Sequence, residues 1–281
     1  MSCWALAALR WRILLAPAPG LRIRHTFSYI AIGYLANTLL PMRLGELARA
    51  TLIGRSKRLG VSRALGSIAL ERTMDLLGLI AVALMMTLVM ELPAGVQTTI
   101  GTLAAVGVGG LFFLLFLSLH QQHLPRLTGL LAAIMPHRFA DRIITLIRNF
   151  SYGAGVFRHP ARVAAVLLLT LMQVTLAGVA TLLWIRAFQL PVPWYGAYVV
   201  LVVVNLGSAI PSSPGYIGVY HYLAILALSL WVPDRSAALA YAIGTHALNM
   251  LANIGVGAFC LASEDLTLRH LTQEAAPVRD V

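Results

Sequence analysis

Long stretches of this chain contain almost no charged residue, and this limits the folds that it can adopt. A helix that crosses a bilayer needs about 20 mostly apolar residues. Four stretches meet this requirement: Leu76–Met90 with a polar lead-in from Val61, Thr98–Leu119, Val163–Ile185 and Ala237–Ala262. Only 11% of the 281 residues are charged, whereas soluble domains contain about 25%. The composition therefore excludes an ordinary soluble domain and predicts an all-α, polytopic transmembrane helical bundle.

Two further apolar stretches are interrupted by proline. Each consists of two halves: Thr26–Leu40 and Met42–Gly54 around Pro41, and Ala197–Ile210 and Gly215–Trp231 around Pro211–Pro214. The halves are too short to cross a bilayer upright. The first stretch begins and ends at basic residues, and the second lies between loops without Lys or Arg. We therefore predict two re-entrant helix hairpins that enter from opposite faces, as in inverted-repeat transporters; two proline-kinked spanning helices are the alternative.

The basic residues indicate the orientation of the chain. Its formal net charge of +11 would suggest nucleic acid in a soluble protein, but here the basic residues lie between apolar runs. The positive-inside rule therefore places the 55–58 loop and the connector 120–162 in the cytoplasm, together with the tail 263–281. We predict a single multi-pass domain, residues 1–281, in the cell (inner) membrane, without a nucleic-acid partner. Met1–Ala16 is short for a span, and we expect it to be the end of a truncated first helix.

Six ionisable residues lie close to apolar segments: Arg43, Glu46, Arg49, Glu71, Arg72 and Asp75. Each such group costs about 2.5–3.5 kcal/mol at the centre of a membrane helix, so they must be paired, lie near the interface or line a wet cavity. Spacing predicts the i,i+3 pairs Arg43–Glu46, Glu46–Arg49 and Arg72–Asp75. The pairs Glu46/Arg72 and Arg43/Glu71 could form between helices. A structural ion-pair cluster at the cytoplasmic rim and a cavity for a charged substrate both fit this pattern.

The prolines suggest what such a cavity would bind. Proline suits the first turn of a helix, so Pro41 can start one half-helix, and Ser213 can cap the half-helix that Pro214 starts. Two helix N-termini would then point inward, together with arginines, and helix N-termini bind anions. We therefore expect an anionic phospholipid or a polyprenyl-phosphate-linked lipid as partner. The candidate substrate-binding residues are Asn37, Pro41, Arg43, Glu46, Arg49, Glu71, Arg72, Asp75, Asn205, Ser212, Ser213, Pro214, Gly215, His221, His246 and Asn249.

Some of these polar residues also have a simpler interpretation. His221, His246 and Asn249 could form hydrogen bonds between helices rather than line a site. No catalytic residue, metal site or cofactor is expected, because His120 and His123 have no further ligand pattern and nucleotide-binding motifs do not occur.

Three motifs resemble the lysylphosphatidylglycerol synthase transmembrane-region family, whose members are flippase-like bacterial integral membrane proteins. They are Arg10–Leu15 (RWRILL), Gly33–Arg49 (GYLANTLLPMRLGELAR) with Leu70–Asp75 (LERTMD), and Gly207–Tyr220 (GSAIPSSPGYIGVY). The resemblance implies translocation of an anionic lipid or lipid-linked headgroup between leaflets. The family often has Glu where this chain has His221, so a role for that carboxylate is not carried over.

Two other functions remain open at this point. Because the chain ends soon after its last span, the resemblance implies lipid handling rather than aminoacyl transfer by a soluble domain. A membrane-embedded glycosyl- or aminoacyl-lipid transferase would need a base, for which Glu46, Glu71 and Asp75 are candidates. A non-catalytic membrane accessory protein is the third possibility.

Overall fold

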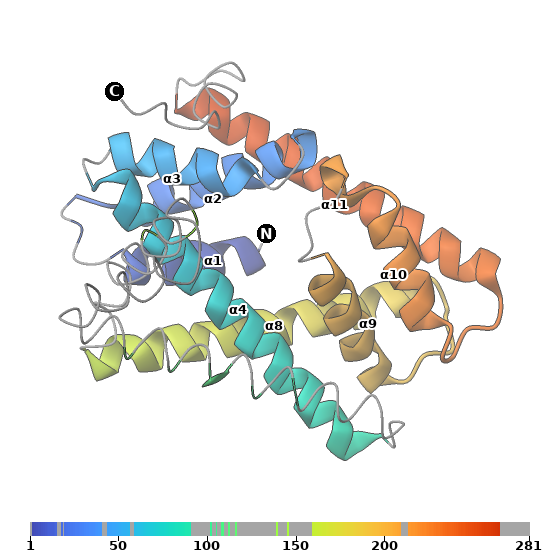
Figure 1. The fold of residues 1–281 in the computed structure, drawn as a ribbon. Helices are drawn as coiled ribbons and strands as arrows, with labels where there is room; N and C mark the ends of the chain where they lie inside the picture. Colours follow the sequence, from blue (N-terminus) through green and yellow to red (C-terminus); the bar gives the residue numbers. More distant parts are fainter. Residues whose placement is uncertain are drawn as a thin grey trace.

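The computed structural model describes residues 2–15, 18, 20–40, 44–56, 59–90, 159–208 and 213–264, with a few single positions between 102 and 145. Each regular element among them is helical (Figure 1). The helices are α1 (Ser2–Leu14), α2 (Ile23–Leu39), α3 (Leu44–Ser56), α4 (Val61–Val89), α8 (Pro160–Ala187), α9 (Trp194–Gly207), the short 3₁₀ turn η3 (Pro214–Tyr216), α10 (Val219–Leu228) and α11 (Arg235–Ser263).

Three long helices are able to cross a membrane. Helices α4, α8 and α11 have 29, 28 and 29 residues, enough for a hydrocarbon core of about 30 Å at 1.5 Å per residue. Large apolar side chains on them are exposed, such as Leu88 (87%) and Phe259 (74%), as expected for surfaces that face lipid. Three of the four predicted spans are thus confirmed, and the polar lead-in from Val61 belongs to the same helix. The predicted span Thr98–Leu119 lies outside the described residues.

The two proline-interrupted stretches each form a pair of antiparallel helices. In the first pair α3 returns along α2, and Gly45 packs against Gly33; in the second α10 returns along α9, and Leu223 packs against Gly207. These helices have 10 to 17 residues, so they are about 15–25 Å long. This length is less than the thickness of the hydrocarbon core of a bilayer, about 30 Å. The hairpin geometry fits the prediction, whereas entry from opposite faces of the membrane stays a prediction.

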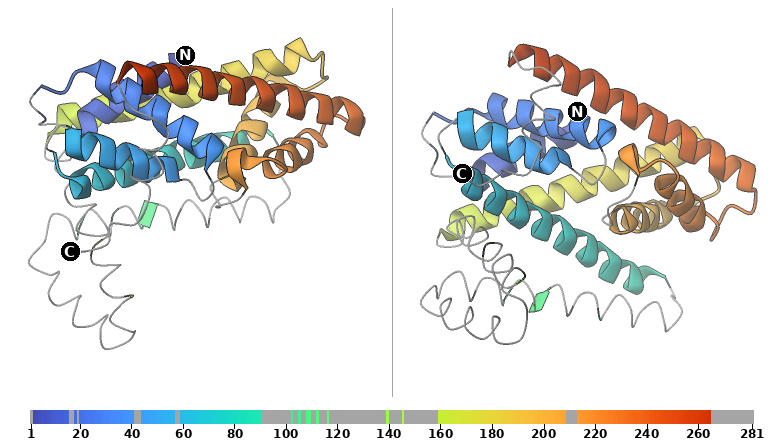
Figure 2. Two further views of the ribbon diagram at one scale, coloured as in Figure 1. Left: turned by 90° about the horizontal axis from the view of Figure 1, so that it is seen from above. Right: turned by 45° about the horizontal axis from the view of Figure 1, so that its top comes forward.

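The two hairpins approach each other from opposite ends of the bundle (Figure 2). Each lies beside a different end of α11: the start of α2 packs near Phe259, and α10 leads directly into α11. The tip of the second hairpin, η3, packs against the end of α2. A Cβ added at Gly215 would lie 3.3 Å from the carbonyl oxygen of Thr38. The tips of the two hairpins therefore meet inside the molecule.

The cap predicted for Ser213 is wrong. The Ser213 hydroxyl donates to the carbonyl oxygen of Ile217 at 2.6 Å and accepts no hydrogen bond from the turn that follows. Left-handed backbone at Gly215 (φ +61°), Tyr216 (φ +59°) and Gly218 (φ +88°) turns the chain before a helix can form. Helix α10 consequently begins at Val219 rather than at Pro214.

Helix α1 packs against α2, α4 and α8 and completes the core at this end of the bundle. Its Trp11, and Leu15 directly after the helix, are fully buried together with Ile30, Ile53 and Leu70. The helix runs from the middle of the molecule towards the start of α4. In the middle of the molecule its Trp4 ring packs against Tyr34, with 5.5 Å between the ring centroids. The expectation that this helix is truncated stays a prediction.

Candidate functional site

Charged side chains from α1, α3 and α4 form one ion-pair cluster. Its members are Arg10, Arg49, Arg72, Glu46, Glu71 and Asp75. Glu71 is its centre and is only 1% exposed. Its Oε2 lies 2.8 Å from Nη2 of Arg49, and its Oε1 lies 3.1 Å from Nη2 of Arg72 and 3.7 Å from Nη2 of Arg10. Three guanidinium groups thus share one buried carboxylate.

The outer pairs of this ion-pair cluster complete the charge balance. Arg72 Nη1 lies 3.3 Å from Asp75 Oδ2, and Arg72 Nε lies 3.5 Å from Glu46 Oε1. Both pairs were predicted from the sequence and are confirmed. Arg10 also binds Asp75 and donates to Thr170 Oγ1 on α8 at 3.0 Å. The formal charges of the three arginines and three carboxylates cancel, so the cluster as described carries no net charge.

Arg49 is held by more than its carboxylate partner. Its guanidinium carbon lies 4.7 Å from the ring centroid of Trp11, a cation–π geometry. Trp11 in turn donates from Nε1 to Ser67 Oγ at 3.0 Å. These contacts connect the α2–α3 hairpin to both α1 and α4, and they orient the Arg49 side chain.

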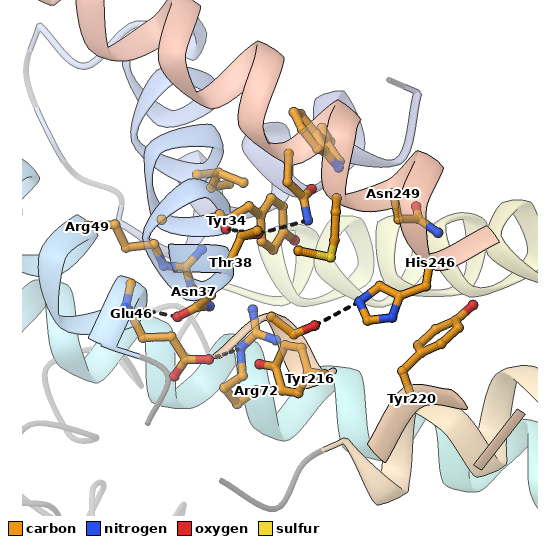
Figure 3. A pocket seen from close by; sticks show the side chains of 17 residues that line it. Tyr34, Asn37, Thr38, Glu46, Arg49, Arg72, Tyr216, Tyr220, His246 and Asn249 are labelled. Atoms are coloured by element: carbon orange, nitrogen blue, oxygen red, sulfur yellow. Dashed lines mark hydrogen bonds and ion pairs between the residues drawn. The ribbon is translucent and has the colours of Figure 1, made fainter. Parts of the chain in front are cut away.

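A polar cavity of about 280 Å³ lies between the two hairpin tips and α11 (Figure 3). We call it the tip cavity. Seven predicted site residues line it: Asn37, Glu46, Arg49, Arg72, Gly215, His246 and Asn249. Residues that were not predicted complete it, mainly Trp4, Tyr34, Thr38, Tyr216, Tyr220, Met250 and Asn253. The predicted residues from both hairpins therefore come together at one site.

The asparagines of the tip cavity are partly used within the fold. Asn37 Oδ1 accepts from the backbone N–H of Gly45 at 2.9 Å, at the start of α3. Asn249 Nδ2 donates to the Thr245 carbonyl at 2.9 Å, and Asn253 Nδ2 lies 3.5 Å from Thr38 Oγ1. The amide oxygens of Asn249 and Asn253 accept no hydrogen bond from any described residue. They leave acceptors for a ligand.

Two histidines form a chain of hydrogen bonds behind the second tip. The Gly218 N–H donates to His221 Nδ1 at 3.2 Å, which places the hydrogen of neutral His221 on Nε2. His221 Nε2 lies 3.2 Å from His246 Nδ1, and His246 Nε2 lies 2.8 Å from the Gly215 carbonyl oxygen. With this tautomer each imidazole ring accepts one hydrogen bond and donates one. The pair ties the tip to α11, the helix–helix role that the sequence left open for these histidines.

A second polar cavity of about 410 Å³ lies next to the tip cavity. Tyr34 and Arg72 line both cavities, and the second one also contains Asp75, Asn205 and Gln173. Gln173 Oε1 is buried and accepts no hydrogen bond within the described part of the chain. Two further predicted residues, Asp75 and Asn205, thus lie beside the tip cavity rather than in its wall.

The remaining predicted residues have other positions. Glu71 is buried in the ion-pair cluster, and His221 supports His246. Ser213 directly precedes η3, and Pro214 is the first residue of η3. Pro41, Arg43 and Ser212 are outside the described residues. Arg10 was missed, although an arginine in an apolar segment is a functional signal by itself. Among the described residues no group of three or more His, Cys, Asp or Glu side chains could hold a metal ion.

Comparison with known families agrees with this arrangement. The family model described as "Lysylphosphatidylglycerol synthase TM region" matches residues 1–257, which includes the ion-pair cluster and both hairpins. The chain belongs to the lysylphosphatidylglycerol synthase transmembrane-region family. Family membership and the apolar helices together identify a membrane protein with a lipid-related function.

One curated relative extends this comparison. "Glycosyltransferase AglD" of Haloferax volcanii is 25% identical to this family member over 314 residues, covering 99% of the chain and 49% of the relative. The chain therefore spans about half the length of the relative. No solved structure matches the chain.

Proposed function

We propose that this protein binds the polar headgroup of a lipid, or of a lipid-linked molecule, in the tip cavity and moves it between the two leaflets. The observation that carries the proposal is the meeting of two hairpin tips at a polar cavity inside an apolar bundle. A polar headgroup is expelled from hydrocarbon unless hydrogen-bonding partners replace water. A wall of amides, hydroxyls and paired charges supplies such partners.

The arrangement of the hairpins supports a transport role. Discontinuous helices that meet near the midplane are typical of transporters, where substrates bind between structural repeats. With the orientation predicted from the basic loops, the α2–α3 hairpin reaches the tip cavity from the cytoplasmic side and the α9–α10 hairpin from the other side. Alternating access would then require only that one tip withdraws while the other stays in place.

The anionic headgroup predicted from the sequence depends on arginines that are not neutralised. Arg49 is bound to Glu71 at 2.8 Å, and Arg72 lies close to Glu46, Glu71 and Asp75. Arg43 is outside the described residues. An anionic phospholipid or polyprenyl-phosphate-linked lipid stays a candidate substrate.

A membrane glycosyl- or aminoacyl-lipid transferase is the second candidate, favoured by the name of the AglD relative. Such an enzyme needs a base with access to its substrate. Glu71 is 1% exposed and bound to arginines, whereas Glu46 lines the tip cavity. Loss of a lipid product in a Glu46→Gln variant that still moves lipid would support a transferase. If the Glu46→Gln variant still forms the lipid product and still moves lipid, the transport function is favoured over a transferase.

The proposal can be tested with purified protein in vesicles. Fluorescent lipids labelled on an acyl chain are placed in both leaflets, and dithionite then reports how fast the inner label reaches the outside. We expect the protein to accelerate this movement for at least one headgroup in a panel. Asn253→Trp, which fills the tip cavity from α11, should abolish the acceleration. Leu251→Trp changes a side chain on the same helix that is 65% exposed and should retain it.

Two results would contradict the proposed transport function. The first is movement no faster than in empty vesicles for every headgroup tested. The second is equal activity of the Asn253→Trp and Leu251→Trp variants, since transport would then not depend on the tip cavity.

A further inference from the structure

The geometry points to a neutral, hydroxyl-rich headgroup, a glycosyl group carried by a lipid, as the ligand of the tip cavity. This inference rests on the proposed function and names the substrate class for the same site. It differs from the anionic headgroup that the sequence alone suggests.

The ion-pair cluster beside the tip cavity is balanced in charge. Each of its arginines lies within 4 Å of at least one carboxylate, and positive and negative groups are equal in number. A phosphate brought to this wall would meet Glu46 beside Arg72. It would have to displace a carboxylate that is already in place, and a cationic headgroup would have to displace a guanidinium. A neutral headgroup leaves the cluster unchanged.

The two helix starts at the hairpin tips are partly occupied by side chains of the protein. Anion binding at such a place uses exposed backbone N–H groups. At the start of α3 the Gly45 N–H already donates to Asn37 Oδ1 at 2.9 Å. At the start of α10 the Gly218 N–H donates to His221 Nδ1 at 3.2 Å. At each helix start, one backbone donor that an anion could use is therefore already bound to a side chain of the protein.

The remaining wall of the tip cavity has the chemistry that a carbohydrate needs. Carbohydrate hydroxyls donate and accept hydrogen bonds, and they need a wall that offers both. Asn249 Oδ1 and Asn253 Oδ1 are acceptors without a partner among the described residues, and each of these amides has a second N–H donor. The Tyr220 hydroxyl is bound to Thr245 Oγ1 at 3.1 Å, and its oxygen can accept a further hydrogen bond. Aromatic rings of Trp4, Tyr34 and Tyr220 supply apolar faces for the C–H groups of a sugar ring.

The size of the tip cavity agrees with one headgroup. Its volume of about 280 Å³ lies just below the range of small-molecule sites, about 300–1,000 Å³. A single sugar ring suits this space, whereas the acyl chains of the same lipid do not need to enter it.

The test compares three lipids with identical labelled acyl chains: monoglucosyldiacylglycerol, phosphatidic acid and lysylphosphatidylglycerol. Binding to the purified protein is measured by native mass spectrometry, and crossing is measured in vesicles. We expect the glucosyl lipid to bind and cross at least ten-fold better than either charged lipid. The double variant Asn249→Leu/Asn253→Leu should lose at least ten-fold in binding of the glucosyl lipid. Leu248→Ala/Leu251→Ala, on the exposed face of the same helix, is the matched control.

The outcomes separate this inference from the proposed function. Equal or better binding of either charged lipid overturns the neutral headgroup, as does an unchanged preference in the double asparagine variant. If a charged lipid also crosses, transport stands and only the headgroup class is wrong. If the glucosyl lipid binds without crossing, the headgroup class stands and transport is wrong. If none of the three lipids binds, both are overturned.

Discussion

Arg49 and Glu71 are joined by a hydrogen-bonded ion pair, with 2.8 Å between Arg49 Nη2 and Glu71 Oε2. The two side chains are 4% and 1% exposed. Arg49 belongs to the first hairpin and Glu71 to the long helix α4, so the pair fastens the hairpin to the bundle. Two other arginines share the same carboxylate, and this makes Glu71 the most sensitive position of the ion-pair cluster.

Replacing this carboxylate should strongly destabilise the protein. Glu71→Gln leaves a buried positive charge without compensation, and removal of one partner from a buried pair costs about 3–5 kcal/mol. Thermal unfolding in detergent should show a clear drop in midpoint. Glu264→Gln, at the end of α11 and outside the ion-pair cluster, should change the midpoint little. Equal midpoints for the two variants would refute the central role of Glu71.

The arginine in α1 should not tolerate a lysine. Arg10 donates to Thr170 and binds Asp75, with Glu71 at 3.7 Å, and a single ammonium group cannot reproduce this fork of donors. We expect Arg10→Lys to lower the free energy of unfolding by about 2 kcal/mol, the value of a hydrogen bond to a charged group. Arg12→Lys is the control, because Arg12 Nε donates to the Leu21 carbonyl outside the cluster. A larger loss in Arg12→Lys would contradict the prediction.

The close approach of α2 and α3 requires glycine at position 45. A Cβ there would overlap the Gly33 carbonyl oxygen and lie 2.7 Å from Asn37 Oδ1. Gly45→Ala should therefore cost about 1–3 kcal/mol, as overpacking does, and should reduce lipid movement. Gly255→Ala on α11, where a Cβ meets no atom within 4 Å, should be neutral or slightly stabilising. Similar stability of both variants would show that the hairpin packs differently.

The two histidines should act as a unit. Because His221 and His246 are hydrogen-bonded to each other at 3.2 Å, the effects of His221→Ala and His246→Ala should not add. A double-mutant cycle of unfolding free energies should give a coupling of about 0.5–3 kcal/mol, typical of residues in one network. Additive losses would mean that each histidine supports the second tip separately.

The long helices could be predicted from the sequence because hydropathy is a local property. The stretch Val163–Ile185 became α8 (Pro160–Ala187), and Ala237–Ala262 became α11 (Arg235–Ser263). The hairpin helices were also predicted, apart from the start of α10. That start depends on a left-handed backbone at Tyr216 (φ +59°), which the residue type does not indicate.

The candidate site could be predicted in part. Arg72 and Asp75 are neighbours on one helix, so spacing alone predicts their ion pair. Arg10 and Asp75 are 65 positions apart, and only the packing of α1 against α4 brings them together. Spacing predicts single ion pairs, but not the one cluster in which three carboxylates balance three arginines, so the cavity expected from the sequence was more cationic than the described residues form.

The account depends most on a lipid headgroup that occupies the tip cavity, between Asn37 of the first hairpin and Asn249 of α11. The most direct test is a cryo-electron-microscopy map of the full chain in lipid nanodiscs that contain monoglucosyldiacylglycerol. We predict headgroup density in the tip cavity, continuous with acyl chains in the surrounding bilayer. A map at the same resolution with an empty tip cavity, and with headgroups confined to the two membrane surfaces, would contradict the account.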